Sequence, residues 1–171
     1  MNKHITRIKT YIHFVHSDAQ KARARFMGVI HMYDADEKLE NFKSVVADCL
    51  FSFQTIEEIL RLTVKEFHRM IEEKIDESFP YNPSIQSIDN AAMGRLIEYF
   101  KVFTNNQELL QNLRELKAMR DKIAHRAFLY QSESFITPPD SSFEEVKEAE
   151  ELSQWCFQYL VEEMDPYRKN V

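Results

Sequence analysis

The chain has 171 residues, and a hydrophobic fraction of 44% is enough for one domain with a substantial core. Only two Gly and five Pro occur, which favours long helices over a sheet with many turns. The net charge of -6 argues against a protein that coats nucleic acid over its whole surface. We find no apolar run of membrane-spanning length and no secretory pattern, so we expect a soluble, cytoplasmic protein with no membrane partner.

Residues 1–35 carry two short helical patterns. The same segment holds His13 and His16, which are spaced as i and i+3 on a helix. A histidine pair alone is weak evidence for a metal site, and exposed or partly packed histidines are the ordinary case. We therefore predict no metal and no cofactor. We expect a single domain, residues 1–171, in which N-terminal helices of residues 1–35 pack on a bundle of residues 37–165.

The longest periodic segment runs from Leu39 to Ile71 without a Gly or Pro. Its apolar residues keep a three-four alternation, which predicts one long helix, or two with a kink near Gln54-Thr55. The acids of residues 34–37 indicate its N-terminus, and the Pro-containing residues 79–84 its end. A second apolar stripe widens the buried face, which favours a globular bundle over a coiled coil.

Three further helices are predicted after this segment. The first spans about residues 91–103 and is expected to be capped by Asp89-Asn90. The second spans about 107–130, and the third runs from about 142 to 164 and is ended by Pro166. The fold class is therefore all-α, an antiparallel bundle of about five to seven helices with one long central helix.

The two cysteines, Cys49 and Cys156, each lie on an apolar helical stripe. In a reducing cytosol such residues behave as small buried hydrophobes. We therefore expect neither a disulfide nor a metal site from them.

The helix around Leu113–Phe128 is where we expect the chemistry. An apolar stripe faces the core there, formed by Leu113, Leu116, Met119, Ile123, Ala124 and Ala127. Arg120 falls inside this stripe, and a guanidinium is costly to remove from water unless an acceptor meets it. The acceptor is either a carboxylate of a neighbouring helix or a phosphate, which suits the planar fork of arginine.

His125 lies about 140° round the helix from Arg120, so the two cannot share one pocket wall on a straight helix. Either the helix is distorted, or a second copy across a twofold axis contributes its own Arg and His. Asp121 precedes His125 by four residues, close enough to orient the imidazole and raise its proton affinity.

Charge is distributed unevenly along the chain. The N-terminal segment is basic and the last helix is acidic, which we interpret as a solvated face. The motif helix is locally basic through Arg114, Lys117, Arg120, Lys122 and Arg126. An RNA backbone could be held there despite the negative total.

The segment from Arg120 to His125 resembles the Arg-x4-6-His signature of HEPN domains (higher eukaryotes and prokaryotes nucleotide-binding). Met93–Ile97 is similar to the Gly-x-Leu-Ile stretch that often opens the preceding helix in such proteins, and the likeness in architecture covers about residues 42–160. Asp121 stands where Asn is commoner in the family. The resemblance implies a metal-independent endoribonuclease with a toxin or phage-defence role, a homodimer, RNA as substrate and an antitoxin protein as partner.

The same resemblance implies roles for the motif residues. His125 would move protons while the RNA 2′-hydroxyl attacks the adjacent phosphate, and Arg120 would steady the charge on its oxygens. Asp121 would orient the histidine. The RNA backbone would be positioned by Lys117, Lys122 and Arg126.

Other functions remain open. The helical layout is also similar to that of the mannitol operon repressor family, which implies a non-catalytic regulator or binding module in which Arg120 and His125 hold the fold or the dimer together. A nucleotide or small ligand could also bind at the same basic site. The sequence has no Gly-rich phosphate loop, no CxxC pair, no HExxH and no Gly-x-Ser-x-Gly elbow, which excludes kinase, P-loop, zincin and hydrolase assignments.

Overall fold

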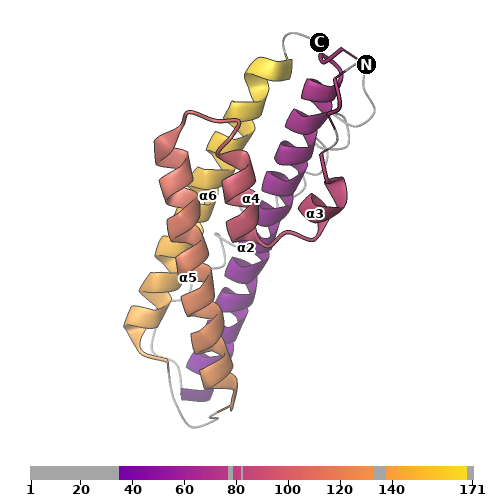
Figure 1. The fold of residues 1–171 in the computed structure, drawn as a ribbon. Coiled ribbons are helices and arrows are strands. Elements are labelled where there is room, and N and C mark those ends of the chain that lie inside the picture. The colour runs from indigo at the N-terminus through magenta and orange to yellow at the C-terminus, as the bar shows by residue number, and fades with distance from the viewer. Residues whose placement is uncertain (1–34, 77–78, 82, 133–137, 169–171) are drawn as a thin grey trace.

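The computed structural model describes residues 35–76, 79–81, 83–132 and 138–168, which form an elongated helical bundle (Figure 1). Its helices are α2 (Ala35–Glu72), α3 (Ile85–Asp89), α4 (Met93–Phe100), α5 (Gln107–Ser132) and α6 (Asp140–Arg168). Every regular element in these ranges is helical, so the all-α prediction is confirmed. The predicted N-terminal helices, with His13 and His16, lie outside the described residues.

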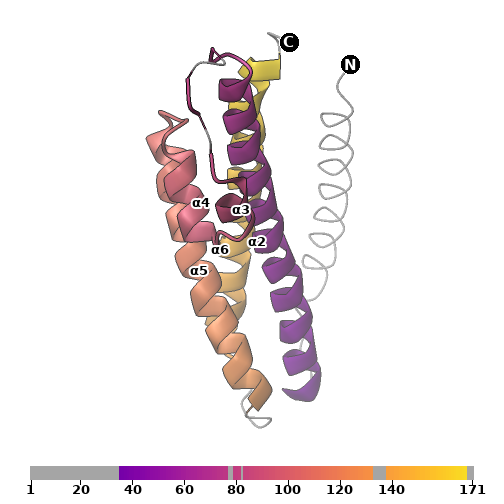
Figure 2. The same ribbon diagram turned by 45° about the vertical axis from the view of Figure 1, so that its right-hand side comes forward.

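The three long helices α2, α5 and α6 pack against one another along most of their length (Figures 1 and 2). Helices α2 and α6 are parallel, because Lys38 binds Asp140 at 2.6 Å near their starts and Thr63 Oγ1 donates to Met164 Sδ at 3.2 Å near their ends. Helix α5 packs against both and runs in the opposite direction. The predicted antiparallel packing thus describes α5 against its neighbours, while the first and last long helices share one direction.

The spine predicted from Leu39 to Ile71 is one continuous helix, α2. At the point where a kink was one of two possibilities, Thr55 is buried and its hydroxyl donates to the Phe51 carbonyl at 3.0 Å, so the helix satisfies this polar group internally. Helix α2 ends at Glu72, before the prolines. In the described residues 72–76 every side chain is exposed or only partly buried, so no buried side chain there favours continuing the helix.

The expected cap of α4 is wrong. Asp89 and Asn90 belong to the end of α3: Asn90 Nδ2 donates to the Gln86 carbonyl at 3.0 Å, and Asp89 pairs with Lys65 of α2. Helix α4 instead begins after Ala92, which forms no side-chain cap. Its start is set by burial, since α4 presents an apolar face to α2 and α5.

The predicted start of α5 agrees with the structure, and the predicted end of α6 does not. Asn106 caps α5, with its Oδ1 accepting from the Leu109 amide at 3.0 Å, and the predicted start at Gln107 is confirmed. Helix α6 continues to Arg168, so the prediction that Pro166 ends it is wrong. A proline interrupts the hydrogen bonds of a helix at its own position, and the helix nevertheless continues through the remaining residues of its last turn.

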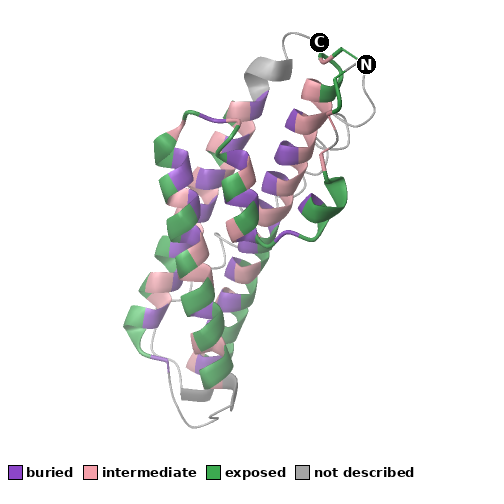
Figure 3. Ribbon diagram, viewed as in Figure 1, coloured by how far each residue is buried: buried purple, intermediate pink, exposed green. Residues whose placement is uncertain are grey.

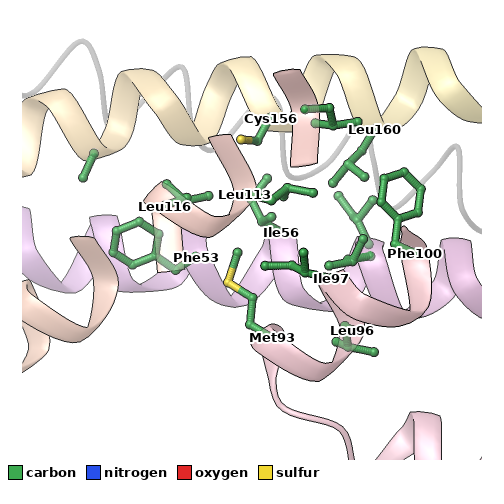
Figure 4. Close-up of a cluster of buried hydrophobic side chains, with 14 of the residues drawn as sticks. Phe53, Ile56, Met93, Leu96, Ile97, Phe100, Leu113, Leu116, Cys156 and Leu160 are labelled. Carbon is green, nitrogen blue, oxygen red and sulfur yellow. The ribbon is translucent and has the colours of Figure 1, made fainter. Parts of the chain in front are cut away.

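The core lies between α2, α5 and α6, with α4 inserted against its middle and upper part (Figures 3 and 4). Figure 4 shows side chains from all four helices meeting there: Phe53, Ile56, Met93, Leu96, Ile97, Phe100, Leu113, Leu116, Cys156 and Leu160. Cys49 and Cys156 are buried free thiols, as predicted. Burial raises the pKa of both, for Cys156 to about 12, so the thiols stay neutral.

Candidate functional site

Arg120 occupies a core-facing position of α5. Leu113, Leu116 and Ile123 are buried, and Arg120 continues their spacing of three and four residues. Its side chain nevertheless keeps 26% exposure, because it lies at the edge of the α2/α5 contact. The guanidinium is therefore held by the fold without being sealed from solvent.

Two carboxylates meet the Arg120 guanidinium. Nη1 donates to Glu57 Oε2 of α2 at 2.8 Å. Nε and Nη2 donate to Asp121 Oδ1 at 3.2 and 3.1 Å. The acceptor that this position requires is thus present within one chain, and one of the two carboxylates comes from a neighbouring helix.

Glu57 connects Arg120 to a second arginine. Its Oε1 accepts from Arg61 Nη2 at 3.0 Å, one turn further along α2. Arg61 in turn donates to the Ala91 carbonyl at 3.1 Å and contacts Glu58. The sequence pattern does not single out Glu57 or Arg61, although an i, i+4 pair beside a buried stripe is a signal that could draw attention to them.

Asp121 closes the other end of this network. Lys117 Nζ lies 2.6 Å from its Oδ2, and hydrogen bonds from Lys117 and then Arg120 hold the pKa of this carboxyl below its usual value. Within the described residues Asp121 thus serves two cations, and no contact joins it to His125. A fully charged ammonium and guanidinium compete well against an imidazole for one carboxylate. The predicted orienting of His125 by Asp121 stays a prediction.

Lys122 and Arg126 face α6 instead. Lys122 Nζ lies 3.0 Å from Glu145 Oε1, and Arg126 pairs with the other oxygen of the same carboxylate. Hydrogen bonds from Arg126 and then Lys122 lower the pKa of Glu145. Two of the three cations predicted to position an RNA backbone therefore tie α5 to α6, and Lys117 belongs to the Arg120 network.

His125 lies on the outward face of α5, which we define by its exposed residues Ala118, Asp121, Lys122, Ala124, His125, Phe128 and Leu129. The placement of Ala124 in the core-facing stripe is therefore wrong. The imidazole forms none of the hydrogen bonds or ion pairs found among the described residues. Phe128 is 67% and Leu129 43% exposed, so the histidine is flanked by apolar groups that face solvent. A single chain thus presents the arginine at the edge of the core and the histidine outward, as the helical spacing requires.

The chemistry available here is acid–base and electrostatic. The described residues contain no group of His, Cys, Asp and Glu side chains suited to a metal ion. None of the described helices is long and apolar enough to cross a membrane.

Comparison of the chain with protein-family models, with curated proteins and with solved structures finds no match.

Proposed function

We propose that this protein is a metal-independent endoribonuclease of the HEPN type that acts on RNA in the cytoplasm. A toxin or phage-defence role, with an antitoxin protein as partner, is the setting that the resemblance implies. The observation that carries the proposal is the state of the motif residues: Arg120 is fixed by two carboxylates yet still 26% exposed, and His125 is exposed with no partner among the described residues. An anion-binding group and a proton carrier are both reachable from solvent.

The proposed reaction is transfer of the phosphate to the neighbouring ribose oxygen. His125 accepts the proton of the 2′-hydroxyl, whose oxygen forms a bond to phosphorus while the bond to the 5′-oxygen breaks. A water molecule donates a proton to that 5′-oxygen, and His125 then releases its own proton to solvent. Arg120 stabilises the charge that builds on the non-bridging oxygens, a role that a preoriented guanidinium fills well.

A second copy of the chain is part of this proposal. The histidine and arginine of one α5 point about 140° apart, so a phosphate between them needs residues from two helices. A twofold contact brings the same surface to itself and supplies both groups at once. The exposed Phe128 and Leu129 beside His125 favour such a contact, because apolar side chains gain by leaving water.

The test is incubation of the purified protein with structured RNA in EDTA. We expect cleavage by the parent, and a loss of about 100-fold or more in His125→Ala and Arg120→Ala. Arg69→Ala is the matched control, because Arg69 lies on α2, is partly exposed and pairs with Glu66 and Glu73. RNA that stays intact with the parent, or a His125→Ala variant as fast as the parent, rejects the nuclease.

A non-catalytic regulator or binding module, similar to the mannitol operon repressor family, is the second candidate. It is favoured by the bond from Arg120 to Glu57, which ties α5 to α2 and gives the arginine a structural role. Under this alternative Arg120→Ala lowers the free energy of unfolding by about 1 kcal/mol, as loss of a partly exposed pair does, and neither the parent nor the variant cleaves RNA. A nuclease loses a similar amount of stability in Arg120→Ala together with its cleavage, so RNA cleavage is measured beside stability. Cleavage of RNA by the parent separates the two, and chemical denaturation measures the stability of the parent and the variant.

A further inference from the structure

We propose that Glu57 is a positioning residue that orients Arg120 toward the RNA phosphate; this inference rests on the proposed nuclease function. Glu57 lies on α2 and touches no group of the motif except the Arg120 guanidinium, through the 2.8 Å bond to Nη1. Its other oxygen is occupied by Arg61. The residue thus acts on a bound RNA only through the arginine.

The guanidinium is fixed on two sides by this arrangement. Glu57 holds Nη1, and Asp121 holds Nε and Nη2. Asp121 is on the same helix as Arg120 and moves with it. Glu57 is therefore the residue that fixes the arginine relative to another helix of the bundle. An arginine side chain has several rotatable bonds, and a partly exposed one needs such an anchor to keep a single orientation.

Glu57 itself is well supported. Its neighbours along α2, Ile56 and Leu60, are buried in the core, which fixes the backbone that carries it. Arg61, held by the Ala91 carbonyl, keeps the second carboxylate oxygen engaged. Glu57 therefore cannot turn to accept from Arg120 with both oxygens.

This sharing leaves Arg120 able to bind an anion. Each of its nitrogens donates to a carboxylate, but Nη1 and Nη2 each carry a second N–H. The Glu57 carboxylate pairs with Arg61 as well as with Arg120, so its negative charge is shared between two guanidinium groups. A phosphate that reaches the partly exposed guanidinium can accept from the remaining N–H groups of Nη1 and Nη2.

The experiment compares Glu57→Gln, which keeps the shape and removes the charge, with Glu57→Asp, which keeps the charge on a shorter side chain. Glu66→Gln is the matched control, because Glu66 is also on α2, is similarly exposed (25% against 21%) and pairs with Arg69. Single-turnover cleavage, affinity for a 2′-O-methyl RNA of the same sequence, and thermal unfolding are measured for each. Arg120→Lys and the double variant Glu57→Gln with Arg120→Lys complete a cycle.

We expect Glu57→Gln to lower the cleavage rate about tenfold or more, with RNA affinity changed by less than about threefold, because misorientation penalises the reacting geometry. Glu57→Asp recovers part of the rate, and the double variant is no slower than Arg120→Lys alone. A merely structural role would add the two losses and lower the unfolding temperature in parallel. Glu66→Gln cleaves at the parent rate.

Two outcomes overturn the inference, and they are distinguishable from each other. If Arg120→Ala and His125→Ala abolish cleavage while Glu57→Gln and Glu57→Asp cleave at the parent rate, the nuclease stands and the role of Glu57 is refuted. If the parent leaves RNA intact in EDTA, the proposed function fails, and the role of Glu57 with it. Should Glu57→Gln not fold, the rate of Glu57→Asp decides, and an unchanged rate refutes the role.

Discussion

The two halves of α5 differ in how the bundle covers them. In the first half Leu109, Leu110, Leu113 and Leu116 are completely buried. In the second half Arg120 interrupts the apolar stripe and the outward face shows Phe128 and Leu129 to solvent. One continuous helix therefore serves as core at one end and as a candidate site at the other.

The short helix α4 accounts for this difference. It lies beside α2 and the first half of α5 (Figure 1), and a Cβ placed on Gly94 in its first turn would lie 3.3 Å from Lys117 Cε. Lys117 thus passes close to the beginning of α4. Beyond Lys117 the helix α5 packs on α2 and α6, and His125 lies on its exposed side.

The largest expected effect concerns the buried half. Leu113→Ala should lower the free energy of unfolding by about 2–5 kcal/mol, since it removes a fully buried side chain and leaves a cavity. Urea denaturation measures the loss. Leu129→Ala, in the exposed half, is the control and should cost less than about 1 kcal/mol. Equal losses in the two variants would remove the distinction between the halves.

A smaller effect concerns the attachment of the second half to α6. Glu145→Gln weakens the pairs with Lys122 and Arg126 and should cost about 0.5–1 kcal/mol at neutral pH. Because the folded-state pKa of Glu145 is lowered, the carboxylate contributes this stability above its unfolded-state pKa and loses it as pH falls through the folded-state value. The difference between parent and variant should therefore vanish in acid. Denaturation curves collected from neutral to acidic pH measure it, and a difference that persists undiminished in acid would contradict an origin in this ion pair.

The smallest effect on stability, and the sharpest on assembly, is expected at Phe128. Phe128→Ser should change the free energy of unfolding by less than about 0.5 kcal/mol, because the side chain is 67% exposed. If the outward face of α5 joins two copies, the same change weakens self-association, which sedimentation velocity measures over a range of concentrations. Val102→Ser is the control, since Val102 is exposed at 79% but lies after α4, away from the motif. A dimer equally strong in Phe128→Ser places the contact elsewhere.

Local rules account for much of the fold. The alternation from Leu39 to Ile71 specifies α2 nearly to its ends, because each turn repeats the same apolar face. The start of α5 follows from Asn106, whose side chain satisfies a free amide of the first turn. The cap of α4 was not predictable in this way, since burial against α2 and α5 outweighed the local signal of Asp89-Asn90. The end of α6 was not predictable either, because the helix continues past Pro166 to Arg168.

For the candidate site, the sequence by itself determined that Arg120 needs an acceptor and that His125 points elsewhere, because both follow from helical geometry and from the cost of burying a charge. Only the tertiary structure decided which acceptor it is. The bond to Glu57 depends on how far α5 is shifted along α2, and the pairing of Lys122 and Arg126 with Glu145 depends in the same way on α6. Such shifts are set by the packing of whole helix faces, which no single stretch of sequence contains.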